Sequence, residues 1–155
     1  MTARRVSLAT LALLLGAMSC TADPTDGSDV DTTFAAQMAS TWHYAGAPQR
    51  VQVGIAASDS NGVRVVTQGT VDFEFAYLGT DGSGTPEAGP TATGEYVPVP
   101  GTDGSGVAPT ITSGARGVYE AEGVTFDRAG IWRATLSPEI DGVARQLTVD
   151  FPVTG

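Results

Sequence analysis

The sequence contains no lysine, one histidine and one cysteine, and only 16% of its 155 residues are charged. A single cysteine cannot form an internal disulfide. Long runs of Ala, Leu, Glu and Lys at helical spacing are also missing, which argues against a helical domain. Glycine (20 residues) and proline (nine residues) are abundant instead. This composition favours a single turn-rich, all-β domain with extensions.

Acidic residues outnumber basic ones by 17 to 8, which gives a formal net charge of −9. Two of the basic residues, Arg4 and Arg5, lie in an N-terminal leader. Without this leader six basic residues face 17 acidic ones, a net charge of −11. An acidic surface repels phosphate backbones, which argues against a nucleic-acid partner. We interpret the acidity as a source of solubility.

Residues 1–19 have the three parts of an export signal. Met1 to Arg5 carries two positive charges, Val6 to Leu15 is an apolar run too short for a comfortable transmembrane span, and small residues follow. Ser19 supplies the small side chain that a signal peptidase needs before its cleavage site, and Cys20 comes next. The sequence therefore predicts cleavage between Ser19 and Cys20. The alternative is an ordinary secretory signal with a chance cysteine.

The four residues Ala17-Met18-Ser19-Cys20 resemble the lipobox of bacterial lipoproteins, usually written Leu-Ala-Gly/Ser-Cys. Ala17 departs from the favoured Leu, and Met18 is not the commonest residue at its place. The resemblance implies a thioether-linked diacylglycerol on Cys20, cleavage before it, and N-acylation, for example with palmitate. Two or three acyl chains give stable anchoring, so membrane lipid is one expected partner.

The same resemblance implies a protein of the bacterial cell envelope, facing the periplasm or the exterior. In a Gram-negative organism, Thr21 in place of Asp after the cysteine favours the outer membrane. Residues 20–40 are expected to be a flexible acidic linker between the lipid and the domain. The stretch "TADPTDGSDVDTT" is nearly free of apolar residues, so it cannot bury enough surface to fold.

Residues 41–155 alternate apolar and polar side chains in short runs. The clearest run places Val71, Phe73, Phe75 and Tyr77 on one face. Asn61-Gly62 and Asp141-Gly142 are hairpin turn signals, and a bulge is expected at Gly123. A strand within 91–100 is expected at a sheet edge because Pro98 and Pro100 cannot donate ladder hydrogen bonds. Further strands are predicted near 41–45, 51–55, 63–66, 117–126, 131–136 and 147–151.

These strands, about seven in all, predict an antiparallel β-sandwich, because two sheets packed face to face bury such alternating faces without helices. The hexapeptide "GTDGSG" occurs twice, at 79–84 and 101–106. It is interpreted as a pair of flexible loops. The alternative, a duplicated ion-binding loop, has only one Asp in each copy, whereas calcium takes six to eight oxygens.

The block "GVYEAEGVTFDRAGIWRATL" is similar to the last hairpin of bacterial extracytoplasmic immunoglobulin-like domains of the FixH-like and YtkA-like families. The resemblance covers Gly117 to Val153 and implies an immunoglobulin-like fold, with Tyr119 and Trp132 in the core and Gly130 in the turn. It implies no activity. Some relatives of that group handle copper through His and Met ligands, which makes His43 and Met38 weak candidate ligands here.

The sequence contains few sets of residues that could act together in catalysis. His43 is the only candidate imidazole base, no serine lies in a Gly-x-Ser-x-Gly elbow, and Glu120 and Glu122 fit a solvated sheet face better than a glycosidase cleft. We therefore expect no enzymatic activity and no cofactor. The expected function is a lipid-anchored extracytoplasmic binding or accessory module that acts on a protein partner through loops or sheet edges. The alternative is a copper-handling accessory protein of the cell surface.

Overall fold

The computed structural model describes residues 32–102 and 106–155. Within these ranges every regular element is a β-strand, which confirms the all-β prediction. The strands are β1 (Thr33–Met38), β2 (Gln49–Asp59), β3 (Gly62–Thr67), β4 (Thr70–Tyr77), β5 (Glu87–Pro98), β6 (Thr110–Thr112), β7 (Gly117–Val124), β8 (Gly130–Ser137), β9 (Glu139–Ile140), β10 (Val143–Ala144) and β11 (Leu147–Val153).

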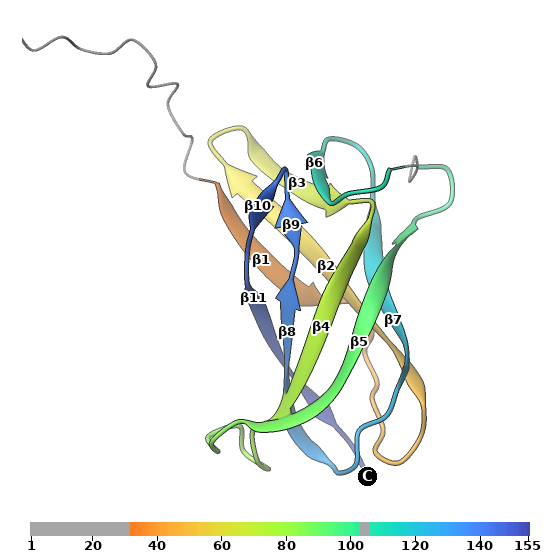
Figure 1. The fold of residues 1–155 in the computed structure, drawn as a ribbon, viewed down its shortest axis with the longest axis vertical. Coiled ribbons are helices and arrows are strands. Elements are labelled where there is room, and N and C mark those ends of the chain that lie inside the picture. Colours follow the sequence, from red (N-terminus) through yellow and green to blue (C-terminus); the bar gives the residue numbers. More distant parts are fainter. Residues whose placement is uncertain (1–31, 103–105) are drawn as a thin grey trace, which may run out of the picture.

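Nine strands form one curled antiparallel sheet in the order β11-β8-β4-β5-β7-β2-β3-β6, with β1 paired to β2. β9 and β10 form a separate hairpin. The sheet curls until β1 packs beside β11, so one core lies inside it (Figure 1). This arrangement is consistent with a β-sandwich-like fold.

The pairing order β1-β2-β7-β5 and β4-β8-β11 follows the ABED and CFG sheets of a constant-type immunoglobulin domain. Here, however, β4 and β5 are also paired, from Thr70 opposite Glu95 to Tyr77 opposite Glu87. The two halves are therefore one continuous sheet along this side. The hairpin strand β3 and its partner β6 are additions to that order. Membership of the immunoglobulin-like class stays a prediction.

The core follows the predicted alternation. Val71, Phe73 and Phe75 of β4 are buried, and Trp132, Ala134 and Leu136 of the neighbouring strand β8 are buried beside them on the same face of the sheet. Each large apolar side chain removed from water contributes about 1.5–3 kcal/mol. Aromatic rings form a cluster within the core, in which Phe126 contacts the rings of Phe75, Trp132 and Phe151.

The domain begins earlier than the sequence indicated. β1 lies within residues 20–40, which were assigned to the linker, and it pairs along its whole length with β2, from Thr33 opposite Ser58 to Met38 opposite Val53. The reason is that Phe34, Ala36 and Met38 alternate onto the core side and pack there. The boundary at residue 41 is therefore wrong, and the sheet starts at Thr33.

Two strand predictions are corrected. Residues 41–45 form no strand; only Tyr44 and Ala45 make isolated bridges, to Thr154 and Phe126. β5 is internal, between β4 and β7, because its prolines do not interrupt either ladder. Pro98 is its last residue, and Pro90 lies where the register to β4 shifts.

Both predicted hairpins are confirmed, although the turn of the first lies one residue earlier than Asn61-Gly62. β2 and β3 join through Ser60 and Asn61 with Asp59 opposite Gly62, and β9 and β10 join through Asp141-Gly142. The bulge at Gly123 is also present: the β7–β2 register shifts there, and Gly123 has a φ of 69°.

The strands run between two ends of the molecule (Figure 1). At the entry end the chain enters β1 beside the β2–β3 hairpin, the β5–β6 connection and the β9–β10 hairpin. The far end carries the β1–β2, β4–β5 and β7–β8 connections and the C-terminus.

Candidate functional site

The predicted cleavage and lipidation residues, Ser19 and Cys20, lie outside the described residues. In the part of the chain that the structure describes, no helix is long and apolar enough to cross a membrane. What the structure does fix is the point at which the chain leaves residues 1–31 and joins the sheet. That point is Thr33, at the entry end.

His43 lies in the core, with 3% of its surface exposed. Its ring packs on Phe151 and Phe126, with centroid distances of 4.8 and 6.3 Å. Burial lowers the pKa of His43, and a hydrogen bond to the backbone carbonyl of Pro152 partly opposes this. Since the ring donates to Pro152, its Nε2 accepts from the Ser40 hydroxyl at 2.8 Å.

Met38 contacts the same hydroxyl, with its sulfur 3.5 Å from Ser40 Oγ. The structure therefore brings the two candidate copper ligands, His43 and Met38, to one serine. Ser40 Oγ also accepts the backbone N–H of Gln52, which ties the site to β2. Both ring nitrogens of His43 are engaged, so a metal would have to displace Ser40. Across residues 32–102 and 106–155, no group of three His, Cys, Asp or Glu side chains is placed to hold a metal.

The residues on either side of His43 are strongly exposed. Trp42 is 73% exposed and Tyr44 is 54% exposed. They project from the β1–β2 connection at the far end. Exposed Trp and Tyr are uncommon on a surface that serves only solubility, and they are enriched at protein interfaces.

The loop that carries these aromatics is firmly held. The N–H of Ala45 donates to Thr154 and the N–H of Gly46 donates to Phe126, each at 2.8 Å. The Gln49 side chain bonds both the N–H and the carbonyl of Tyr44. With His43 also seated in the core, the backbone between the two aromatics is fixed before any partner arrives. Such preorganisation reduces the entropy lost on binding.

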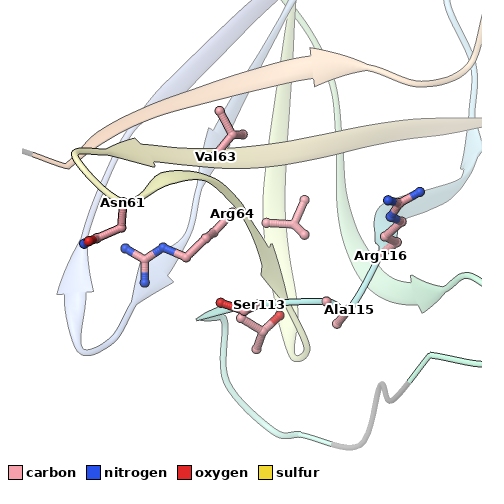
Figure 2. Close-up of a pocket in the computed structure, with 9 residues that line it drawn as sticks. Asn61, Val63, Arg64, Ser113, Ala115 and Arg116 are labelled. Atoms are coloured by element: carbon pink, nitrogen blue, oxygen red, sulfur yellow. The ribbon is translucent and has the colours of Figure 1, made fainter.

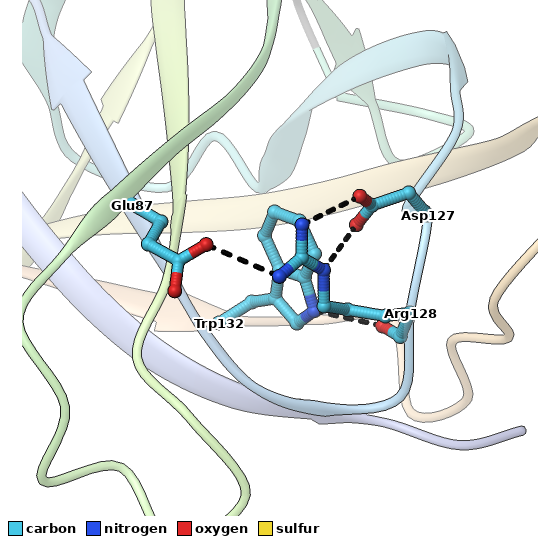
Figure 3. A network of polar contacts seen from close by, with 4 residues as sticks. All are labelled: Glu87, Asp127, Arg128 and Trp132. Atoms are coloured by element: carbon cyan, nitrogen blue, oxygen red, sulfur yellow. Dashed lines mark hydrogen bonds and ion pairs between the residues drawn. The ribbon is translucent and has the colours of Figure 1, made fainter.

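Next to this loop, the β7–β8 turn holds a polar network (Figure 3). The Arg128 guanidinium bonds Asp127 and Glu87 and lies 4.9 Å from the centre of the Tyr77 ring. The indole N–H of Trp132 donates to the carbonyl of Arg128 at 3.1 Å. The Arg128 guanidinium lowers the pKa of Asp127 through its hydrogen bond.

A hollow of about 270 Å³ adjoins this network and is lined in part by Tyr77, Pro90 and Trp132. Gly89 lets the Trp132 ring pack closely against β5, because a Cβ there would lie 2.5 Å from this ring. The far end thus combines exposed aromatics, a guanidinium and a shallow hollow.

The entry end carries a different feature, a groove of about 480 Å³ between β3 and the β6–β7 connection (Figure 2). Arg64 and Arg116 lie at its two ends, and Val63 and Ala115 line it between them. Arg64 pairs with Asp59, whose side chain is almost fully buried. Arg116 makes no ion pair with any residue of the described ranges.

The two carboxylates singled out on β7 lie on the outer face of the sheet. Glu120 accepts from the Gln52 amide and pairs with Arg50 at 3.6 Å. Together with Glu95 and Glu122 it borders a shallow polar hollow. Glu122 is exposed, as the prediction of a solvated face requires, whereas the Glu120 side chain is only 11% exposed because Gln52 and Arg50 cover it.

The first hexapeptide loop is held by its own side chains. Asp81 Oδ1 accepts from the N–H of Ser83 at 2.9 Å and from its hydroxyl at 2.8 Å, and these bonds lower the pKa of Asp81. In the second copy, residues 103–105 lie outside the described ranges. The structure therefore shows a self-bonded turn at 79–84.

No protein-family model, curated protein or solved structure matches the chain. The resemblances at residues 17–20 and 117–153 therefore stay predictions.

Sequence reasoning missed the exposed aromatic pair and the groove. The sequence predicted Trp42 and Tyr44 to belong to a strand. Their alternation with the polar His43 fits equally well a loop in which His43 points into the core and the two aromatics point outward. The groove depends on Arg64 and Arg116, which are far apart in sequence, and no local signal joins them.

Proposed function

We propose that the protein is a lipid-anchored extracytoplasmic binding module that docks a protein partner with its far end. Cys20 carries the lipid, and the chain from it joins the sheet at the entry end. The aromatic loop lies at the opposite end, which places it away from the point of attachment. The proposal assigns no catalytic step to the protein.

The observation that carries the docking part is the exposure of Trp42 directly before a backbone segment, His43 to Gly46, that is hydrogen-bonded to the rest of the domain. Trp, Tyr and Arg are the residues that contribute most binding energy at protein interfaces. The far end presents one of each in Trp42, Tyr44 and Arg128. A rigid aromatic platform of this kind suits a protein surface with a matching hollow.

The anchor is tested with Cys20→Ser. The wild-type protein is expected to stay with membranes after a high-salt wash, whereas the variant is released. Retention of the variant on washed membranes contradicts lipid attachment at this sulfur.

The docking surface is tested with Trp42→Ala in the full chain. Cross-linking in intact cells, followed by quantitative mass spectrometry, is expected to show the loss of a defined partner from the variant. Val143→Ala, which shortens an exposed valine at the entry end, is the matched control and keeps that partner. An unchanged partner set in Trp42→Ala contradicts docking at the far end.

Trp and Tyr also favour the membrane–water interface, so a membrane contact is the competing outcome. Binding of the Cys20→Ser protein to phospholipid vesicles distinguishes the two. If these vesicles bind the Cys20→Ser protein and Trp42→Ala removes that binding, the far end contacts lipid and the protein-docking proposal is wrong.

A further inference from the structure

The groove at the entry end is an interruption in the pairing of β3. The first half of β3, Gly62 to Arg64, pairs with β2 alone, Val65 pairs with both β2 and β6, and Val66 and Thr67 pair with β6 alone. Beyond Thr112 the chain turns away through 113–116, and the groove opens between this connection and the unpaired edge of β3. Alternate residues of an antiparallel strand direct N–H and C=O groups away from their partner strand, so this edge can receive an extended segment.

The charges around the groove select the kind of segment. Arg64 lies at the Asn61 end and Arg116 at the other (Figure 2). Arg50, Arg64, Arg128 and Arg133 each pair with a carboxylate, and Arg145 lies over the Phe34 ring. Among the arginines of the described ranges, Arg116 alone has neither kind of partner. A guanidinium in this position favours carboxylates, which it binds with paired hydrogen bonds.

We propose that the acidic segment 23–31 of this same chain docks in this groove. The segment carries Asp23, Asp26, Asp29 and Asp31 and no basic residue, so its charge complements the groove. It joins the sheet at Thr33, whose partner Ser58 lies one residue before the end of β2, directly beside the β2–β3 hairpin. The segment therefore starts at the end of the molecule where the groove lies.

The distances fit. Neighbouring strands lie about 4.8 Å apart, so the free edge of β3 is roughly 10–15 Å from β1 across β2. An extended chain covers about 3.3 Å per residue, so four or five residues reach the groove. Asp29 lies at that minimum length from Thr33, and the chain to Asp26 and Asp23 is longer than the distance requires. A segment linked this closely has an effective concentration in the millimolar range, which favours it over a free acidic peptide.

The docking is electrostatic and shallow. Exposed ion pairs are weak and are screened by salt. The segment therefore exchanges between docked and free states, and the exposed length of the linker shortens when it docks.

Disulfide trapping in the full-length, detergent-solubilised protein tests the proposal. Thr25→Cys, which keeps all four aspartates of the segment, is combined either with Ser113→Cys in the groove or with Ser58→Cys beside β1. A free linker meets position 58 more often, because Ser58 pairs with the residue where the linker begins. Docking reverses this order, and we expect the Ser113 pair to close about tenfold faster, which corresponds to about 1.4 kcal/mol.

Two further measurements test whether the faster closure of the Ser113 pair is electrostatic. High salt and Arg116→Gln are each expected to remove most of the advantage of the Ser113 pair, whereas Arg133→Gln, on the outer face of β8, leaves it intact. Faster closure at Ser58, or equal closure at both positions, overturns the proposal. A cross-linked dimer in place of the intramolecular bond shows that the groove takes the segment of a second copy, which also overturns it.

Discussion

The far end and the entry end differ in how firmly their exposed side chains are held. At the far end, Trp42 and Tyr44 project from a loop whose backbone between His43 and Gly46 is bonded to Thr154, Phe126 and Gln49. At the entry end, the groove is bordered by an unpaired strand edge and by Arg116, which has no ion-pair partner in the described ranges. The first arrangement suits a specific and lasting contact, and the second suits a weak contact that salt disrupts.

The largest expected effect is on the free energy of unfolding, and it compares Phe126, which supports the aromatic loop from the core, with the exposed Trp42. Phe126→Ala removes a ring at the centre of the aromatic cluster, beside the carbonyl that holds Gly46. We expect the free energy of unfolding to fall by about 3–5 kcal/mol, measured by urea denaturation. Trp42→Ala is the control and should change it by less than about 0.5 kcal/mol. Equal losses in both variants would show that Trp42 is a structural residue.

The next effect concerns the one firmly held charge at the entry end. Arg64→Gln leaves the buried Asp59 carboxylate without its cation, although the N–H of Asn61 still donates to it at 2.7 Å. The expected loss is about 1–3 kcal/mol in the same assay. The double variant Arg64→Gln with Asp59→Asn should recover part of it. No recovery would show that Arg64 acts through packing alone.

A smaller effect follows from His43. Burial lowers the pKa of its imidazole in the folded state, so between this value and the unfolded pKa of about 6.5 the unfolded chain binds more protons. Stability therefore rises with pH through that window and is lost as the pH falls from about 6.5 towards the folded pKa. The slope cannot exceed about 1.4 kcal/mol per pH unit. Urea midpoints between about pH 5 and 7 measure it.

His43→Gln is the control for this titration. The variant should be less stable overall, and the slope in this pH window should disappear. A slope that persists in the variant assigns it to carboxylates instead.

The smallest effect is expected at the surface network of the far end. Arg128→Gln removes ion pairs to Asp127 and Glu87 and the contact with the Tyr77 ring. We expect a slight fall in Tm at low salt that vanishes at high salt, because the pairs are exposed. Arg50→Gln, with a single long pair to Glu120, should change Tm still less. A large, salt-independent fall would show that Arg128 organises the turn.

The sequence predicted the parts of this fold that local patterns encode. The alternation of Val71, Phe73 and Phe75 gave the right strand and the right buried face. Asn61-Gly62 gave the right hairpin, and Gly123 the right bulge. These patterns depend only on residues that are neighbours in the sequence, so they can be interpreted without knowing which strands pair.

The errors arose where distant residues decide the outcome. β1 was read as linker because its small side chains become a strand only against β2. At 41–45 the polar His43 is buried and the aromatics are exposed, because Pro152, more than 100 residues away, satisfies the imidazole. β5 was predicted at an edge because a proline cannot donate a ladder hydrogen bond. The sequence does not show that Pro98 ends the strand and that Pro90 lies at the register shift to β4, where no ladder bond is lost.

The position of Trp42 directly after β1 has a mechanical consequence. A pull on the linker that is resisted by a partner holding Trp42 runs through the backbone from Thr33 to Trp42, most of which is the already extended β1. The chain between these two points is already nearly extended, so it lengthens little under tension. The load therefore runs along β1 and does not pass through the other strands, which can stay folded while the two attachment points are under tension.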